Sequence, residues 1–174
     1  MWVMAIRSGL VSVAALLSAV AGLFLWREPV GSVSIGPIAM STPDNRPRGI
    51  RNNNPGNIEY HANNDWLGQV GSDGRYSVFD KPENGIRALA RLLINYGRFY
   101  GLETVGGIVS RWAPDFENDT ASYVRAVADR LGVQPFDVLE SGQLPDLVKA
   151  IIHHENGQQP YSDAVISAGV RAAR

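Results

Sequence analysis

A glutamate near the end of the chain occupies a position where a hydrophobic side chain is expected. In KAIIHHENGQQPY, residues 149–161, Ile151 and Ile152 lie at helical spacing, Glu155 continues their face, and Gly157 ends the helix. Apolar surroundings and the negative end of a helix dipole both favour the protonated form of a carboxyl group. Glu155 is therefore a candidate general acid, as cleavage of a glycosidic bond requires. The alternative is a helix-end residue that faces solvent.

Other catalytic chemistries have weaker support in the sequence. His153 and His154 are adjacent, so they point about 100° apart on a helix, and the third histidine, His61, is remote without HExxH spacing. We therefore expect no metal and no cofactor. The chain has no cysteine and no GxSxG motif, and its glycine-rich GQVGSDG segment reads as a hairpin turn. The net charge of −1 gives no sign of a nucleic-acid partner.

An acidic stretch precedes another predicted helix. APDFENDT, residues 113–120, contains Glu117 and Asp119, and Tyr123 follows one turn into the helix. Asp119 is also a good helix cap, which is the simpler interpretation. We take Glu117 and Asp119 as candidate substrate contacts and as candidates for a second carboxylate. Glu59 and Asp73 are weaker candidates for that second carboxylate.

The segment RNNNPGNI contains three asparagines that are candidate substrate contacts: Asn53, Asn54 and Asn57. Amide groups donate and accept hydrogen bonds, which suits sugar hydroxyl and acetamido groups. The equally good alternative is a set of asparagine-anchored turns that hold a small β-lobe. Trp66 and Trp112 are candidates for stacking on sugars or for core positions.

The pattern of elements predicts an α+β domain, mostly helical, over residues 49–174. Leu67–Val70 and Arg75–Phe79 read as a hairpin around a Ser-Asp-Gly turn. Asp80 is expected to cap the helix that follows, with Glu83 completing a capping box. The further helices are expected at 104–112, 119–131, 135–139, 145–155 and 164–173.

The N-terminal segment differs from the rest of the chain. Ser8 to Trp26 is a charge-free run of nineteen residues, preceded by Arg7. Such a run predicts a transmembrane helix or signal-anchor over residues 1–28, with a cleavable signal peptide as the alternative. Residues 29–48 contain four prolines and read as a flexible linker. Arg7 favours a cytoplasmic N-terminus, so we expect an inner-membrane anchor with the domain in the periplasm, and release is possible in principle.

Several motifs resemble lytic enzymes. AIIHHENGQQPYSDAVISAGV resembles the motif of lytic transglycosylases and goose-type lysozymes in which an isoleucine-rich helix ends in the catalytic glutamate. DTASYV, residues 119–124, is similar to their Glu-Thr-x-x-Tyr-Val stretch, whose tyrosine lines the cleft. NNNPGNI and YSVFDKPENGIRALARLL resemble the related glucosaminidases. The resemblance implies a lysozyme-like domain with a β-hairpin lobe, with Glu155 as the acid and Tyr123 as its neighbour.

The order of these motifs is reversed, because the glutamate helix comes first in those families and last here. The resemblance therefore implies a circularly permuted domain. RGIRNNNPGNI and WAPDFENDT also look like a group of phage virion proteins that are similar to the lytic enzyme of enveloped double-stranded RNA phages. Phage endolysins of similar layout use the N-terminal segment as a signal-anchor.

Together these observations predict a phage muralytic enzyme that cuts the glycan of peptidoglycan between N-acetylmuramic acid and N-acetylglucosamine. The reaction is that of a muramidase or of a lytic transglycosylase. The alternatives are a peptidoglycan endopeptidase and a non-catalytic virion or wall-binding protein. Because Glu155 follows Ile151 and Ile152, we expect it at the floor of a groove between the helices and the β-lobe, close to the asparagine turn.

Overall fold

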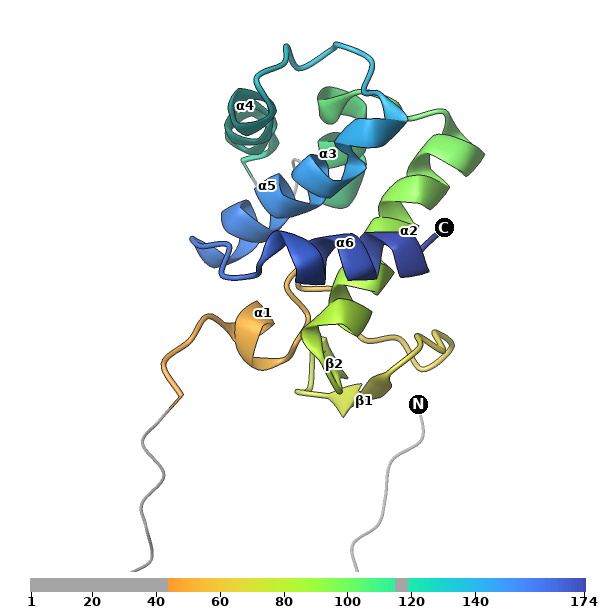
Figure 1. Cartoon of the computed structure of the whole chain (residues 1–174), viewed down its shortest axis with the longest axis vertical. Coiled ribbons are helices and arrows are strands. Elements are labelled where there is room, and N and C mark those ends of the chain that lie inside the picture. The colour runs from red at the N-terminus through yellow and green to blue at the C-terminus, as the bar shows by residue number, and fades with distance from the viewer. Residues whose placement is uncertain (1–43, 115–118) are drawn as a thin grey trace, which may run out of the picture. The chain divides into compact units, whose positions relative to one another are not determined.

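The computed structural model describes residues 44–114 and 119–174. Most of this part of the chain is helical, with one small hairpin (Figure 1). The helices are α1 Arg48–Arg51, α2 Pro82–Tyr100, α3 Val105–Trp112, α4 Thr120–Leu131, α5 Leu144–Asn156 and α6 Asp163–Ala172, with a short 3₁₀ helix at Ser141–Gln143.

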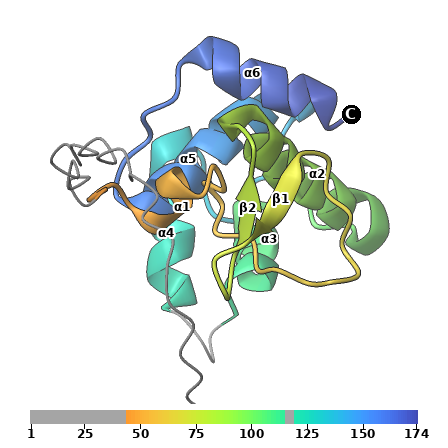
Figure 2. The same ribbon diagram turned by 90° about the horizontal axis from the view of Figure 1, so that it is seen from below.

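The β-lobe consists of β1, Gln69–Ser72, and β2, Ser77–Phe79, which pair antiparallel. Ser72 pairs with Ser77 beside the turn, and a bulge between Gln69 and Gly71 interrupts the register. A single bridge between Glu59 and Tyr76 places the chain after the asparagine turn alongside the hairpin. The predicted hairpin is therefore confirmed, and seen from below it lies beside α1 and α2 (Figure 2).

A single apolar core forms where the helices meet. α2 packs against α6, and α5 packs against α4 and α6 (Figure 1). Ile86 and Leu89 of α2, Ile151 and Ile152 of α5 and Ile166 of α6 are each fully buried. Burial of one such side chain contributes about 1.5–3 kcal/mol. Because Ile151 and Ile152 are fixed in this core, the last turn of α5 has a defined orientation.

Two local expectations were wrong. Lys81, not Asp80, precedes the first turn of α2, because Pro82 begins the helix, and the Asp80 carboxylate accepts a hydrogen bond from Asn84 instead. The predicted helical turn at 135–139 is a loop, which pairs with the chain before and at the start of α3 through Gly106 N–Pro135 O and Leu139 N–Glu103 O, both 2.8 Å.

The transmembrane part of the fold prediction also needs correction. No helix within residues 44–114 and 119–174 is long and apolar enough to cross a membrane. α2 has 19 residues, but it is amphipathic and carries charged residues, including Arg87, Arg91 and Arg98. The expected span, 8–26, lies outside the described residues. The fold is thus a mostly helical domain with a two-stranded sheet, and it includes no demonstrated membrane span.

Candidate active site

Glu155 lies in the last turn of α5, where the helix leaves the core. Ile151 and Ile152 are buried one turn earlier, whereas the Glu155 side chain is half-buried. Gly157 ends the helix in the left-handed region at φ 67°, a conformation that costs glycine little. The sequence pattern therefore puts a carboxylate at the border between core and solvent.

Three side chains from three different parts of the chain donate hydrogen bonds to this carboxylate. Trp112 Nε1 lies 3.0 Å from Oε1, and the Tyr123 hydroxyl lies 2.8 Å from the same oxygen. Asn57 Nδ2 lies 3.0 Å from Oε2. Donors on both oxygens fix the plane of the carboxylate as well as its position. The arrangement resembles a positioned acid–base group more than a surface glutamate.

Tyr123 is a rigid donor. It is 3% exposed, and its ring stacks on the His154 imidazole with centroids 3.5 Å apart and planes inclined by 14°. Burial, and then the negative charge of Glu155, raise the pKa of Tyr123 well above its usual range. The phenol therefore keeps its proton and donates to Glu155 at any physiological pH. Partial burial lowers the pKa of His154, so its neutral form is favoured beside Tyr123.

The ends of α3 and α4 are tied together beside the glutamate. The Thr120 hydroxyl, at the start of α4, donates to the backbone carbonyl of Ala113, directly after α3. Asp119 caps α4 through a 3.0 Å bond from the Ser122 amide to its carboxylate. This junction sets Trp112, on α3, and Tyr123, on α4, at the distance that lets both reach one carboxylate oxygen.

Glu155 opens into a cleft of about 270 Å³ between the β-lobe and the helices. Its lining combines residues of the asparagine turn and β-lobe with residues of α2, the end of α3 and Glu155. The lining residues are Gly56, Asn57, Ile58, Glu59, Arg75, Tyr76, Leu92, Tyr96, Trp112, Ala113 and Glu155. Polar atoms dominate this lining, as expected of a site that binds a polar ligand such as a sugar.

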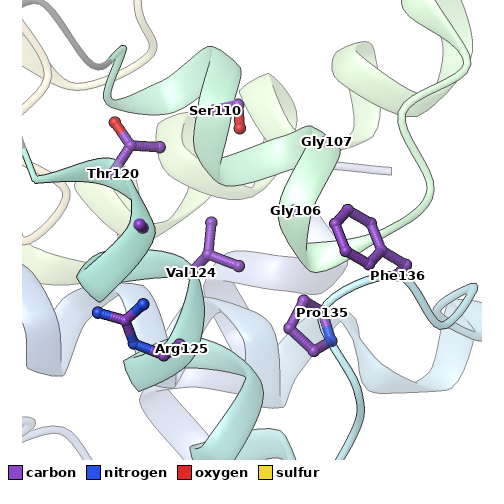
Figure 3. Close-up of a pocket in the computed structure, with 9 residues that line it drawn as sticks. Gly106, Gly107, Ser110, Thr120, Val124, Arg125, Pro135 and Phe136 are labelled. Carbon is purple, nitrogen blue, oxygen red and sulfur yellow. The ribbon is translucent and has the colours of Figure 1, made fainter.

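A second hollow, of about 510 Å³, lies between α3 and α4 (Figure 3). Gly106, Gly107 and Ser110 line one side, Thr120 and Arg125 the other, and Phe136 covers one end. The described residues around it include no carboxylate, so it offers no acid. This hollow is larger than the Glu155 cleft. The cleft is nevertheless the better candidate active site, because it contains carboxylates, whereas the described residues around this hollow include none.

Comparison with known proteins identifies a relative. The chain is 40% identical over 126 residues to "Protein P5" of Pseudoalteromonas phage PM2, an alignment that spans 70% of this chain and 79% of the phage protein. The chain belongs to the Protein P5 family. No protein-family model matches the chain.

Membership of the Protein P5 family makes this a phage-type protein, which agrees with the phage character expected from the sequence. The name of the relative says nothing about chemistry. The candidate site must therefore be assessed from the positions of its own residues.

The three asparagines have different positions. Asn57 reaches Glu155. Asn54 is fully buried and bonds to Ile58 and to the Ser77 carbonyl, so it holds the β-lobe together. Asn53 donates to the Phe79 carbonyl from a left-handed backbone conformation, φ 50°. The turn-anchoring interpretation thus applies to Asn53 and Asn54, whereas Asn57 is the asparagine that reaches the cleft.

The candidates for a second carboxylate also lie in different places. Asp119 serves as the cap of α4, and Glu117 lies outside the described residues. Asp73 is held by Arg48, with Nε–Oδ2 at 2.6 Å. Glu59 lines the cleft, where Arg75 Nη2 lies 2.9 Å from its Oε1. Of the described candidates for a second carboxylate, Glu59 is the one that shares the cleft with Glu155.

Sequence analysis missed the hydrogen bond from Trp112 and the role of Asn156. Both Trp66 and Trp112 pack against the core, as one of the two alternatives predicted, but the bond from the Trp112 indole to Glu155 was not expected. Asn156 donates to the Pro55 carbonyl at 2.7 Å and so ties the end of α5 to the asparagine turn. The sequence shows that Asn156 follows Glu155 at the helix end. Its burial, which the structure shows, explains why its side chain needs a polar partner.

The paired histidines face different neighbours. His154 stacks on Tyr123, whereas His153 Nε2 lies 2.9 Å from Arg130 Nη2. Among the described residues, no three histidine, cysteine, aspartate or glutamate side chains converge as a metal-binding group would.

Proposed function

We propose that this protein is a phage muralytic enzyme that cleaves the glycan strand of peptidoglycan, with Glu155 as its general acid. The observation that carries the proposal is the Glu155 carboxylate, held by Trp112, Tyr123 and Asn57 at the edge of a polar cleft. General acid catalysis needs one carboxyl group in a fixed position beside the leaving oxygen. Its contribution is typically about 10²- to 10⁴-fold in rate.

The hydrogen bonds distinguish the two oxygens of Glu155. Oε1 accepts from both Trp112 and Tyr123, so its lone pairs are occupied by donors. Oε2 accepts from Asn57 alone, which leaves it room for a proton. In the proposed reaction, Oε2 gives this proton to the oxygen between N-acetylmuramic acid and N-acetylglucosamine as that bond breaks. Water or a hydroxyl of the sugar itself then bonds to the positively charged sugar carbon, and the proton it loses goes to the Glu155 carboxylate, which restores the acid, or to a second carboxylate.

Glu59 is the candidate for a second carboxylate. It lines the same cleft as Glu155, and Arg75 pairs with it at 2.9 Å. Glycosidases that activate water use a second carboxylate in the same site as the acid. A muramidase therefore needs Glu59, whereas a lytic transglycosylase does not.

The contact between the asparagine turn and α5 supports the proposed permuted lysozyme-like arrangement. That arrangement requires these two segments to form opposite walls of one cleft, and Asn57 and Asn156 join them directly. Because peptidoglycan is the proposed substrate, the proposed site of action is the periplasm, at the cell wall. The phage relative is compatible with a role in wall penetration or in host lysis.

The test is digestion of purified sacculi by the wild-type protein and by Glu155→Gln, with the products identified by mass spectrometry. Glutamine keeps the shape of glutamate but has no acidic proton, so we expect at least about a hundredfold loss of cleavage. The wild-type products should carry either reducing ends, from attack by water, or anhydro ends, from attack by the sugar. Glu155→Gln should still bind sacculi.

Glu103→Gln is the matched control, because Glu103 is exposed and its side chain makes no hydrogen bond within the described part of the chain. It should cleave like wild type. Free peptide termini in the products would instead indicate an endopeptidase. Binding to sacculi without any wild-type cleavage would indicate a wall-binding virion protein. Either result would overturn the proposal.

A further inference from the structure

Three side chains beside the cleft form what we call the aromatic–arginine cluster: Tyr96 and Tyr100 of α2 and Arg111 of α3. The two tyrosine rings meet edge to face, with centroids 6.4 Å apart. The Arg111 guanidinium lies 3.5 Å from the Tyr100 ring centre and 5.3 Å from the Tyr96 ring centre. Cation–π contact of this kind holds a guanidinium in a defined plane.

The cluster is continuous with the proposed active site. Tyr96 itself lines the Glu155 cleft. Arg111 is followed by Trp112, whose indole bonds to Glu155. The cluster therefore borders the cleft through Tyr96, while Tyr100 and Arg111 lie outside the cleft lining.

The cluster is accessible and its charge is unused. Tyr100 is 55% exposed, and Arg111 is exposed as well. No acidic side chain among residues 44–114 and 119–174 pairs with Arg111. Stacking occupies the face of a guanidinium, whereas its five N–H donors point outward in the plane. These donors are thus available to a ligand, and a fixed planar fork matches a carboxylate.

An aromatic surface next to an arginine that has no acidic partner among the described residues fits one kind of ligand. Aromatic rings pack against the apolar faces of sugar rings, and the arginine fork binds a carboxylate in a bidentate manner. We propose that the aromatic–arginine cluster is a subsite for an acidic sugar residue, one that carries a carboxylate on or near its ring. This inference rests on the proposed function, because it extends the same cleft.

Peptidoglycan offers two sources of that carboxylate: the lactyl group of the muramic acid and the peptide attached to it. Both present the same chemistry to Arg111. Two soluble probes distinguish them, namely glycan strands freed of peptide by an amidase, and disaccharide units that keep their peptide. A chitin tetrasaccharide, which has no carboxylate, reports the contribution of stacking alone.

The experiment measures binding of these three probes by calorimetry, in the Glu155→Gln background so that no probe is cleaved. Arg111→Ala should weaken binding of at least one acidic probe about tenfold or more, the effect of a lost charged hydrogen bond, and should leave the chitin tetrasaccharide unchanged. Tyr100→Ala should weaken binding of all three. Loss confined to the peptide-bearing probe assigns the carboxylate to the peptide.

Arg98→Ala is the matched control. Arg98 stacks on Phe99 at 5.4 Å near the same end of α2, whereas Arg111 stacks on Tyr96 and Tyr100, the rings that define the cluster. It should bind every probe like the parent. If Arg111→Ala behaves like Arg98→Ala with all probes while wild-type protein still cleaves sacculi, the subsite is refuted and the proposed function stands. Absence of cleavage by wild type would instead refute the proposed function.

Discussion

Asn57 and Glu155, 98 positions apart in the chain, meet in the structure: Asn57 Nδ2 lies 3.0 Å from Glu155 Oε2. The same amide nitrogen lies 3.4 Å from the Glu155 backbone carbonyl. The other end of the amide, Oδ1, is buried and has no hydrogen-bond partner in the described part of the chain. The polar contacts of the Asn57 side chain are thus directed at the glutamate and not at the surrounding fold.

Replacement of Asn57 should therefore affect mainly the cleavage rate, and replacement of Asn54 mainly the stability of the fold. Asn57→Ala should lower the cleavage rate about tenfold or more, since Oε2 loses its donor, and should change stability by only about 1 kcal/mol. Asn54→Ala should destabilise the fold by about 2–4 kcal/mol, because three buried hydrogen bonds to the backbone of Ile58 and Ser77 are lost. Thermal unfolding and a sacculus assay on both variants measure these effects. Equal effects of the two replacements on both measurements would contradict the assignment.

Tyr123→Phe should reduce cleavage and leave the fold intact. The change removes the 2.8 Å donor to Glu155 Oε1 but keeps the ring and its stacking on His154. We expect about a 10- to 100-fold fall in rate, because Trp112 remains as the second donor. Tyr161→Phe is the control, since the Tyr161 hydroxyl is buried without a partner among the described residues. A rate for Tyr123→Phe equal to that of the control would show that this hydrogen bond is irrelevant.

The elements of the domain were largely predictable, because they depend on local patterns. The helical spacing of Ile151, Ile152 and Glu155 predicted α5 and singled out the glutamate. Gly132 correctly predicted the end of α4, where it lies in the left-handed region at φ 70°. The cap of α2 was misplaced by one residue, because two local signals, Asp80 and Pro82, compete at that point. Boundaries of this kind are decided by small energies.

The composition of the site was less predictable than its position. Asn53, Asn54 and Asn57 look alike in sequence, but only packing decides which of them reaches the glutamate. Asn54 turns inward, where its side chain donates to the carbonyls of Ile58 and Ser77 and accepts from the Ile58 amide. Trp112 and Glu155 are 43 positions apart, and no pattern of spacing predicts their hydrogen bond. Long-range contacts of this kind need the fold.

Gly49→Ala should disturb the site from a distance. A Cβ at Gly49 would lie 2.6 Å from Asn156 Oδ1, 2.7 Å from Asn57 Oδ1 and 2.9 Å from the Asn54 carbonyl. Because these atoms crowd one point, the added methyl must displace the amides that join α5 to the asparagine turn. We expect a loss of stability of about 1–3 kcal/mol and a lower cleavage rate. Gly142→Ala is the control, since nothing lies within 4 Å of its added Cβ.

The last prediction concerns acid stability and the ion pair between Asp73 and Arg48. The Arg48 guanidinium, at 2.6 Å and 2.8 Å from the two carboxylate oxygens, and the Asn52 amide hold the pKa of Asp73 well below its usual value of 3.8. The pair joins α1 to the hairpin turn, so it is broken on unfolding. A carboxyl group whose pKa is lower in the folded state stabilises the fold above its unfolded pKa, and this contribution disappears as pH falls.

Asp73→Asn should therefore lower the melting temperature by about 2–4 °C at pH 7, a modest effect because the pair is partly exposed. The difference from wild type should shrink as pH falls from about 4 toward the lowered pKa of folded Asp73, because the unfolded chain takes up the proton first. Asp44→Asn is the control. Arg46 lowers the pKa of Asp44 to about 2, but the partners are only two residues apart and can also pair in the unfolded chain. Thermal melts from pH 2 to pH 7 measure all three proteins. A difference between wild type and Asp73→Asn that stays constant across this range would show that the ion pair does not stabilise the fold through its charge.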